Sequence, residues 1–321
     1  MFSRLCILLA CLPLTLGAQA RPSTASMRSD ATAHAVVLIV TDGLRWQELF
    51  SGADSALISR RPGGVQGSKF SYPGYNEMLT GAADRRIDKN DFGPNPNVTV
   101  FEWLNGRPAL RSRVAAFATW GVFNAIFNTA RAQFPLHAGW GRPPGGLRDG
   151  PERTLDRLFR TTTRLWEDNS YDAFMQTVML EHVRSRKPRV LFVGYGETDE
   201  FAHMRRYDLT LRTARSVDGF IAELWHTMQL MPEYRGRTTF IVTTDHGRGT
   251  GEQWTDHGED VVGAEQIWIA MSGPGVPRLG EIRGHAPVTQ SQIAATIAAL
   301  LGERYSGVTS RAALPLLPVS R

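Results

Sequence analysis

Three continuous runs of apolar residues recur along the chain, and each is followed closely by an aspartate. The runs are Ala35–Thr41 (AVVLIVT), Arg189–Tyr195 (RVLFVGY) and Thr238–Thr244 (TTFIVTT). Runs of this kind are typical of strands that are buried on both faces of a parallel sheet. Shorter apolar segments, Val114–Thr119 and Gln266–Met271, predict two further strands. The sequence therefore predicts a sheet whose central strands lie inside the molecule.

Apolar residues at helical spacing lie between and after these strands. The pattern predicts helices over Tyr171–Arg184, Leu209–Met231 and Gln290–Leu301. Strands that alternate with helices indicate an α/β fold, with a mostly parallel central sheet sandwiched by helices in three layers, α/β/α. The segments Ser51–Ser68 and Pro143–Pro151 are typical of loops. No linker divides residues 35–321, which we expect to form a single domain.

The N-terminus has the pattern of an export signal. Arg4 precedes the apolar stretch LCILLACLPLTLG, and the AQA at 18–20 has the small-x-small form of a signal-peptidase site. We therefore expect residues 1–20 to be a signal peptide, residues 21–34 to be a polar tail, and the mature protein to be exported, periplasmic or secreted. A lipoprotein anchor at Cys11 is the alternative, because the preceding LLA loosely resembles a lipoprotein cleavage box.

Composition narrows the class of protein further. With 321 residues, of which 42% are hydrophobic and 21% charged, the chain is an ordinary globular protein rather than a fibrous, disordered or coiled-coil one. The net charge is +5, but no dense basic run with interleaved aromatic residues occurs, which disfavours nucleic-acid binding. Both cysteines, Cys6 and Cys11, lie in the predicted signal peptide, so the mature chain would contain no disulfide. No apolar segment is long enough for a transmembrane helix.

Acidic residues and histidines gather where the predicted strands end. Asp42, Asp199 and Asp245 each follow a strand, and a single such aspartate is usually a turn former or helix cap. Three of them at one sheet edge, where α/β proteins bind ligands, indicate a site. Histidines accompany them: His203 four residues after Asp199, His246 next to Asp245, and His257 before the last strand. Carboxylates with neutral imidazoles suit Zn²⁺, or Mn²⁺ where oxygen ligands dominate.

Ser71 is the candidate nucleophile. It lies in KFSYPGYNEMLTG, where Pro73 suits the first turn of a helix and places Ser71 just before the helix N-terminus. On this segment alone, an ordinary N-cap serine is the preferred interpretation. A helix N-terminus also favours a phosphoryl oxygen, and a metal ion can activate a serine there.

In this order, the motifs VVLIVTDG, SYPGYNEMLTG, DEFAH, TTDHG and the DHG at 256–258 resemble the alkaline phosphatase superfamily. The resemblance runs from about Val36 to Leu301 and is closest to the nucleotide pyrophosphatase/phosphodiesterase branch. It implies an alkaline phosphatase-like fold and two divalent metal ions. One ion would be bound by Asp199, His203 and His257, and the other by Asp42, Asp245 and His246, with Ser71 facing the second. Asn90 stands where that branch has an asparagine on a phosphate oxygen, although Asn95 and Asn97 are nearby.

The implied activity is hydrolysis of a small phosphorylated substrate through a phosphoserine intermediate. A formylglycine sulfatase is disfavoured, because the Ser-Arg half of the C/S-x-P-S-R motif is missing after Pro73. Phosphotransfer, hydrolysis of a phosphonate or sulfate ester, and a non-catalytic metal- or anion-binding protein remain alternatives.

Two details of the site stay open. Monoester and diester substrates are not distinguished: Lys69, Arg45 and Arg248 are candidate cations for a dianion, and Tyr72, Trp120 and Phe123 are candidate apolar walls or core residues. His285 is the rival of His257 as third ligand. The remaining histidines (His34, His137, His182 and His226) are expected on the surface or on helices.

Overall fold

A single mixed sheet forms the centre of the protein. The structure is a computed structural model that describes residues 34–50, 59–64, 68–141, 151–282, 288–305 and 312–314. Within this part the sheet has eight strands in the order β4-β3-β5-β1-β6-β7-β2-β8. The strands are β1 (Ala35–Thr41), β2 (Ser59–Gly64), β3 (Val114–Ala118), β4 (Leu136–Ala138), β5 (Val190–Tyr195), β6 (Thr238–Thr243), β7 (Gln266–Ser272) and β8 (Val288–Thr289). The predicted signal peptide, both cysteines and His285 lie outside the described residues.

The sheet is mostly parallel, as the sequence predicts. β1 pairs in parallel with β5 on one side and β6 on the other, and β3 pairs in parallel with β4 and β5. β7 runs antiparallel to β6 and to β2. The prediction of a loop over Ser51–Ser68 is therefore wrong at β2. This strand has the sequence SRRPGG, without an apolar pattern, and it is defined by its backbone pairing with β7.

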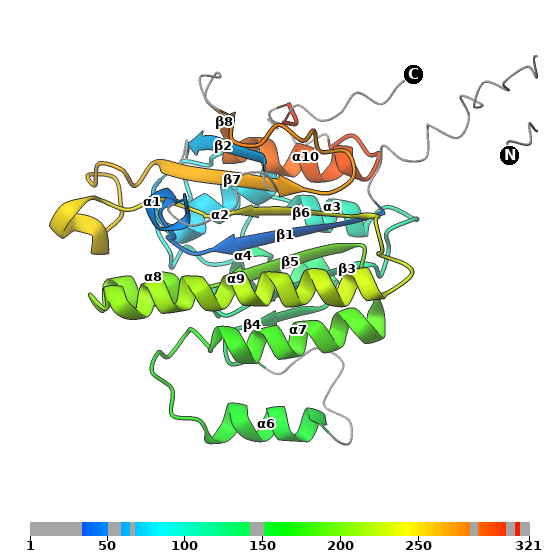
Figure 1. Cartoon of the computed structure of the whole chain (residues 1–321), viewed down its shortest axis with the longest axis horizontal. Helices are drawn as coiled ribbons and strands as arrows, with labels where there is room; N and C mark the ends of the chain where they lie inside the picture. The colour runs from blue at the N-terminus through cyan, green and yellow to red at the C-terminus, as the bar shows by residue number, and fades with distance from the viewer. Residues whose placement is uncertain are drawn as a thin grey trace, which may run out of the picture.

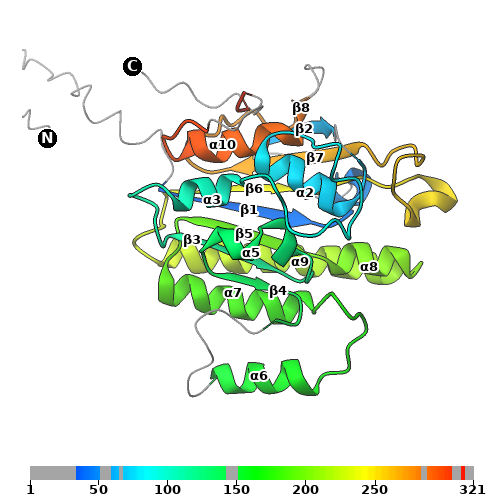
Figure 2. The ribbon, with the colours of Figure 1, turned by 180° about the vertical axis from the view of Figure 1, so that it is seen from behind.

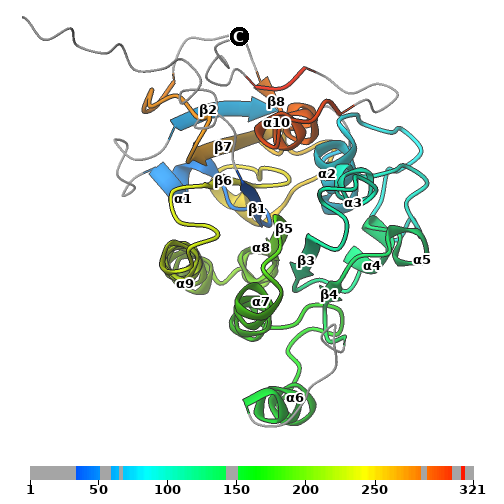
Figure 3. The same ribbon diagram turned by 90° about the vertical axis from the view of Figure 1, so that its right-hand side faces the viewer.

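Helices cover both faces of the sheet, which confirms the α/β fold (Figures 1 and 2). They are α1 (Trp46–Phe50), α2 (Ser71–Thr80), α3 (Val100–Asn105), α4 (Phe123–Ile126), α5 (Thr129–Ala132), α6 (Pro151–Thr161), α7 (Asp172–Arg186), α8 (Glu197–His203), α9 (Tyr207–Leu230), α10 (Ile293–Leu300) and the 3₁₀ turns η2 (Gly251–Thr255) and η3 (Gln290–Gln292). Figure 3 shows the layers edge-on, with α7 and α9 on one side of the sheet and α2 to α5 on the other. Of the predicted loop Pro143–Pro151, residues 142–150 lie outside the described part, and Pro151 begins α6.

Two apolar cores lie on the two faces of the sheet, and β1 contributes to both. Val36, Leu38 and Val40 belong to the core under α2, α3 and α10, whereas Val37 and Ile39 belong to the core under α7 and α9. This alternation follows from the strand period of two residues. It explains why β1 is apolar from Ala35 to Val40, before Thr41 ends the strand.

The carboxyl ends of β1, β5 and β6 lie at one edge of the sheet. Because β7 is antiparallel to β6, its first residues lie at that same edge. The segment that precedes β7, which contains His257, is therefore brought to the ends of the parallel strands. Among the helices that the structure describes, none combines the length and the apolar character that a membrane span requires.

Candidate active site

Asp42, Asp245 and His246 come together at the carboxyl ends of β1 and β6. The Nε2 atom of His246 lies 3.4 Å from Asp42 Oδ1 and 3.6 Å from Asp245 Oδ2. All three side chains are buried. Candidate ligand atoms of the three residues lie within 4.8 Å of one another, as one metal ion requires. The structure thus brings together the three residues that the resemblance assigns to one ion.

Asp199, His203 and His257 form a second group beside the first. Asp199 and His203 lie one turn apart on α8, and His203 Nε2 is 3.2 Å from Asp199 Oδ2. His257 reaches the same place from the segment after η2, with 3.1 Å between its Nε2 and that of His203. The rings of His246 and His257 stack at 3.9 Å between centroids. His246 also lies within 4.8 Å of Asp199 and His257, so it stands between the two groups.

Ser71 lies against the first group. It is the first residue of α2 rather than the residue before it. The N-cap interpretation is therefore wrong, because the backbone of Phe70 occupies that position. Instead, Ser71 Oγ lies 3.4 Å from Asp42 Oδ1 and 3.2 Å from His246 Nε2. The hydroxyl thus points at candidate metal ligands and not at its own helix.

The electrostatics of the first group call for a cation. Burial, followed by the nearby Asp42 carboxylate, raises the pKa of Asp245 to about 7. Burial opposes protonation of His246, but the Asp245 and Asp42 carboxylates outweigh it and raise its pKa to about 9. Burial and then the positive charge of His246 lower the pKa values of His203 and His257. A metal ion would remove the conflict between buried carboxylates of like charge.

The hydrogen bonding of one buried carboxylate indicates whether a metal ion fits this place. Among the described residues, Asp245 Oδ2 is buried and has no hydrogen-bond partner, although its Oδ1 accepts a hydrogen bond of 3.1 Å from the backbone N–H of Gly43. An unpartnered buried polar atom costs roughly 1–3 kcal/mol, and a charged carboxylate oxygen costs more unless a cation meets it. The donor set of carboxylates and imidazoles fits a divalent metal ion at this place.

Asn90 lies directly beside the helix that begins with Ser71. Its Oδ1 accepts a hydrogen bond of 3.0 Å from the backbone N–H of Tyr72. Asn95 and Asn97 instead hydrogen-bond Asn76 Oδ1, away from Ser71. The position of Asn90 therefore suits the role that the resemblance gives it.

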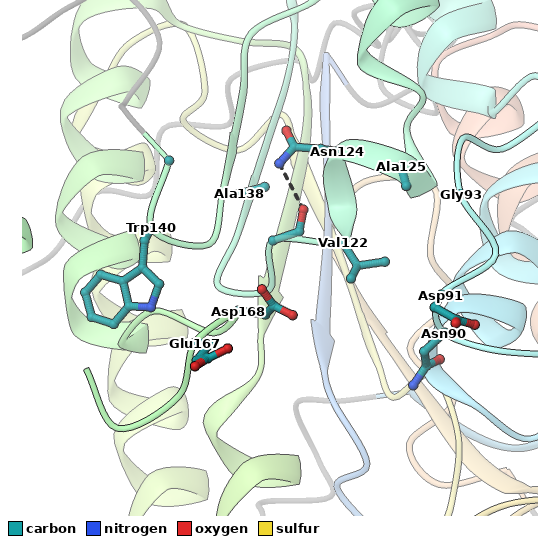
Figure 4. A pocket seen from close by; sticks show the side chains of 12 residues that line it. Asn90, Asp91, Gly93, Val122, Asn124, Ala125, Ala138, Trp140, Glu167 and Asp168 are labelled. Carbon is teal, nitrogen blue, oxygen red and sulfur yellow. Dashed lines mark hydrogen bonds between the residues drawn. The ribbon is translucent and has the colours of Figure 1, made fainter.

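A pocket of about 550 Å³ opens next to Asn90 (Figure 4). Asn90 and Asp91 lie on one side of it, and Trp140, Glu167 and Asp168 on the other. Its remaining lining residues are small or uncharged: Gly93, Gly121, Val122, Asn124, Ala125, Ala138 and Gly141. None of the described lining residues is a lysine or an arginine.

The candidate apolar walls belong to the core instead. Tyr72 and Phe123 are buried in the core under α2, and the hydroxyl of Tyr72 donates to the carbonyl of Gly93. Trp120 packs against the same core. His137 also differs from its prediction: it is a strand residue of β4 and is 1% exposed, because Phe117 and Phe159 pack around it.

Sequence reasoning missed Tyr75, whose hydroxyl donates a hydrogen bond of 3.1 Å to Asp42 Oδ2. The signal was its spacing, because Tyr75 follows Ser71 by four residues and so lies on the same face of α2. Its hydroxyl is fully buried. Burial, and then the charges of Asp245 and Asp42, raise the pKa of Tyr75 well above its usual value, so it remains a donor.

Comparisons with known proteins agree with this fold. One solved structure with the fold is an alkaline phosphatase from the Antarctic bacterium TAB5, with 13% identity, a TM-score of 0.53, and a match over 86% of this chain and 99% of that one. A mutant of the alkaline phosphatase PafA has 11% identity and a TM-score of 0.58 and matches 88% of this chain and 98% of its own. BT1596, a 2-O GAG sulfatase, has 11% identity and a TM-score of 0.60 and matches 86% of this chain and 72% of its own. At these identities the likeness is one of fold. A search of curated proteins found no match.

The family described as "Type I phosphodiesterase / nucleotide pyrophosphatase" matches residues 71–304, which include Ser71 and every candidate ligand except Asp42. The chain has an alkaline phosphatase-like fold and belongs to this family of phosphoric ester hydrolases.

Proposed function

We propose that the protein is an exported metal-dependent phosphodiesterase in which Ser71 is the nucleophile. The observation that carries the proposal is the position of Ser71 Oγ, within 3.4 Å of Asp42 Oδ1 and His246 Nε2 at the start of a buried helix. A serine that points into a group of candidate metal ligands is placed for attack on phosphorus.

The site residues then have separate roles. Asp42, Asp245 and His246 hold one divalent ion, and Asp199, His203 and His257 hold the other. When bound, such ions lower the pKa of the serine hydroxyl and neutralise charge on the phosphoryl oxygens. Zn²⁺ is the metal that three imidazoles and three carboxylates favour, with Mn²⁺ as the alternative.

The chemistry of the chain proceeds in two displacements. Ser71 Oγ loses its proton and bonds to phosphorus, while the bond from phosphorus to the leaving alcohol breaks and the alcohol takes up a proton. Water then attacks the phosphoserine, which restores Ser71 and releases the phosphate product. Asn90, whose Oδ1 is fixed by Tyr72, keeps its amide N–H groups for a phosphoryl oxygen.

The contacts of the candidate cations favour a diester as the substrate. Arg45 is hydrogen-bonded to Glu48 and to the carbonyl of Gly249. Lys69 Nζ donates to the carbonyl of Glu259 and lies 3.8 Å from a carboxylate oxygen of Glu265. A monoester dianion needs a cation for its additional charge, whereas a diester carries one negative charge and does not.

Arg248 is the third candidate cation, and it is also engaged. Its guanidinium contacts Asp199 and the carbonyls of Gly43 and Thr255. Thus, each of the cations that the sequence offers for a dianion is held by acceptors of the protein itself. This supports a substrate with a single negative charge on phosphorus.

The pocket beside Asn90 supports the same substrate class. A volume of about 550 Å³ suits a small organic group. The carboxylates of Asp91, Glu167 and Asp168 and the ring of Trp140 favour an uncharged or positively charged ester group over a second anion.

The test is the ratio of kcat/KM for bis-p-nitrophenyl phosphate to that for p-nitrophenyl phosphate, measured on the zinc-loaded protein. We expect the diester to be preferred by at least about tenfold, because a monoester places an uncompensated charge in the site, worth on the order of 1.4 kcal/mol or more. The matched control is Ser71→Ala, which should lose at least about a thousandfold in kcat while the metal content stays unchanged.

Other outcomes identify other functions. A monoester preference would make the protein a phosphatase and contradict the diester assignment. Activity unaffected by Ser71→Ala would contradict the nucleophile. A protein with full metal content that turns over neither ester would be tested with sulfate and phosphonate esters and with alcohol acceptors. Inactivity on all of these would identify a binding protein.

A further inference from the structure

Most of the candidate metal ligands have one polar atom engaged by a residue outside the ligand groups. Asp245 Oδ1 accepts from the Gly43 N–H, His246 Nδ1 lies 2.9 Å from the carbonyl of Gly247, and His257 Nδ1 lies 3.0 Å from the carbonyl of Lys69. These partners are backbone groups. Fixing one polar atom of a ligand selects the other as the atom that faces the metal.

For two carboxylates the partner is a side chain. Tyr75 donates to Asp42 Oδ2, which leaves Asp42 Oδ1 beside Ser71. Arg248 is ion-paired with Asp199 Oδ1, which also lies 3.9 Å from His246 Nε2 and 4.0 Å from His257 Nε2, while Asp199 Oδ2 lies 3.2 Å from His203 Nε2. These two side chains therefore hold the carboxylates of Asp42 and Asp199 in place.

Arg248 does more than contact one carboxylate. Its Nε donates to the carbonyl of Gly43 at 3.2 Å, its Nη1 donates to the carbonyl of Thr255, and its Nη2 donates to the carbonyl of Asp199 at 3.3 Å. Arg248 is only 3% exposed and follows His246 by two residues. It connects the segments that carry Asp42, Asp199, His246 and His257.

Gly43 shows how closely these segments approach. A Cβ at Gly43 would lie 2.7 Å from Asp199 Oδ1 and 2.8 Å from Arg248 Nε, and the backbone there has a φ of +56°. Only glycine fits this position without displacing the ion pair. The local sequence Asp42-Gly43 is therefore matched to the guanidinium that packs on it.

We propose that Arg248 is a positioning residue for the metal ion of the Asp199, His203 and His257 group. It fixes the Asp199 carboxylate among the candidate histidine ligands, and it holds the segment before His257 at the end of β1. It acts through Asp199 and not on the substrate. This inference deepens the proposed function and rests on the two ligand groups named there.

The test is the metal affinity of variants, measured by Zn²⁺ titration of the metal-free full chain against a chromophoric chelator. We expect the wild type to bind two ions. Arg248→Met should bind one ion with wild-type affinity and the other about 10–100-fold more weakly, as loss of an outer-shell partner does. Arg248→Lys should behave like Arg248→Met, because an ammonium group keeps the charge but not the fork geometry that reaches several acceptors.

The matched control is Tyr75→Phe, which removes the partner of Asp42 and should weaken the other ion. A crossed pattern, in which each variant weakens a different ion, is the expected signature. A merely structural role would weaken both ions alike in Arg248→Met. Thermal unfolding of the metal-free variants reports any general loss of stability separately.

Four results would overturn the proposal. Two ions bound as tightly as in the wild type would show that Asp199 needs no partner. Tighter binding in Arg248→Met would show that the guanidinium repels the ion more than it orients the carboxylate. Wild-type affinity in Arg248→Lys would show that a positive charge is sufficient and that the geometry of the guanidinium is not required. A raised KM for the diester with both ions retained would place Arg248 on the substrate.

The proposed function and the positioning role of Arg248 can be contradicted separately. A wild-type protein that binds no zinc would contradict the proposed function, whatever the variants do. A wild type that binds two ions and cleaves diesters, with unaffected variants, would contradict only the role of Arg248.

Discussion

At the scale of single residues, His137 shows how burial changes the chemistry of a side chain. It lies in β4 between Phe117 and Phe159, and neither of its ring nitrogens has a hydrogen-bond partner among the described residues. Burial lowers the pKa of His137 from 6.5 to about 4. The folded protein therefore keeps this ring neutral at a pH at which the unfolded chain would protonate it.

The consequence is a loss of stability in acid. Because the folded pKa lies below the unfolded one, the contribution of His137 is fully present above about pH 6.5 and is lost as the pH falls toward 4. Between pH 7 and pH 5 the free energy of unfolding should fall by about 2 kcal/mol from this residue. We expect His137→Leu to show a correspondingly smaller decrease in chelator-containing urea titrations.

The exposed His226 of α9 provides the control substitution, His226→Gln, for the replacement of a histidine as such. Equal slopes for the wild type and His137→Leu between pH 5 and pH 7 would show that the ring is protonated in the folded state.

At the scale of elements, the strands and helices with strong apolar patterns were predictable. β1 has the predicted bounds, and α7, α9, β5 and β6 differ from their predictions by one or two residues at their ends. The elements β2, β4 and β8 were not predicted. They are short or polar, and they are defined by pairing with strands that are distant in the sequence. Such pairing leaves no local pattern.

The candidate site, too, was predictable only where it leaves a local pattern in the sequence. The candidate ligands could be proposed because aspartates and histidines stand at strand ends in the sequence. The contacts of Tyr75 with Asp42 and of Arg248 with Asp199 could not, because each depends on how segments far apart in the chain approach one another. For the same reason, the sequence could not show that Arg45 and Lys69 are held by protein acceptors.

Helix α2 positions Ser71, and Gly74 permits its close approach to the strand ends. A Cβ at Gly74 would lie 2.5 Å from the carbonyl oxygen of Asp245. Gly74→Ala should therefore push α2 away from Asp245 and move Ser71 relative to the ligands. We expect kcat/KM for the diester to fall at least about tenfold and stability to fall by about 1–3 kcal/mol.

The control for helical glycine is Gly219→Ala on α9, where an added Cβ meets nothing within 4 Å. This change should leave activity unchanged and stabilise the protein by about 0.5–1 kcal/mol. Wild-type kcat/KM in Gly74→Ala would show that the position of α2 tolerates the shift and that Ser71 need not be held so closely.

At the scale of the whole molecule, the site joins the two apolar cores across one edge of the sheet. Ser71 begins α2, which packs on one face, whereas Asp199 and His203 lie on α8, which leads into α9 on the other face. Asp42 and Asp245 follow strands that lie between these faces. Ions bound here would connect segments from residue 42 to residue 257, so metal binding should stabilise the entire fold.

Removal of the metal ions should therefore lower the Tm of the protein. Each ion at a hundredfold excess over its Kd adds about 2.7 kcal/mol to the folded state. For a chain of this size, two ions correspond to a decrease on the order of 10 °C when a chelator is added at pH 8. Differential scanning calorimetry of zinc-loaded and chelator-treated protein measures this difference.

Asp245→Asn separates metal binding from the repulsion between buried carboxylates. This variant loses a ligand of one ion, and it also removes the charge that opposes Asp42 in the metal-free protein. Its metal-free form should therefore melt at a higher temperature than the metal-free wild type, and its decrease in Tm with chelator should be smaller. If the wild type melts at the same temperature with and without chelator, the buried carboxylates must be satisfied without metal, and the assignment of both ligand groups would be wrong.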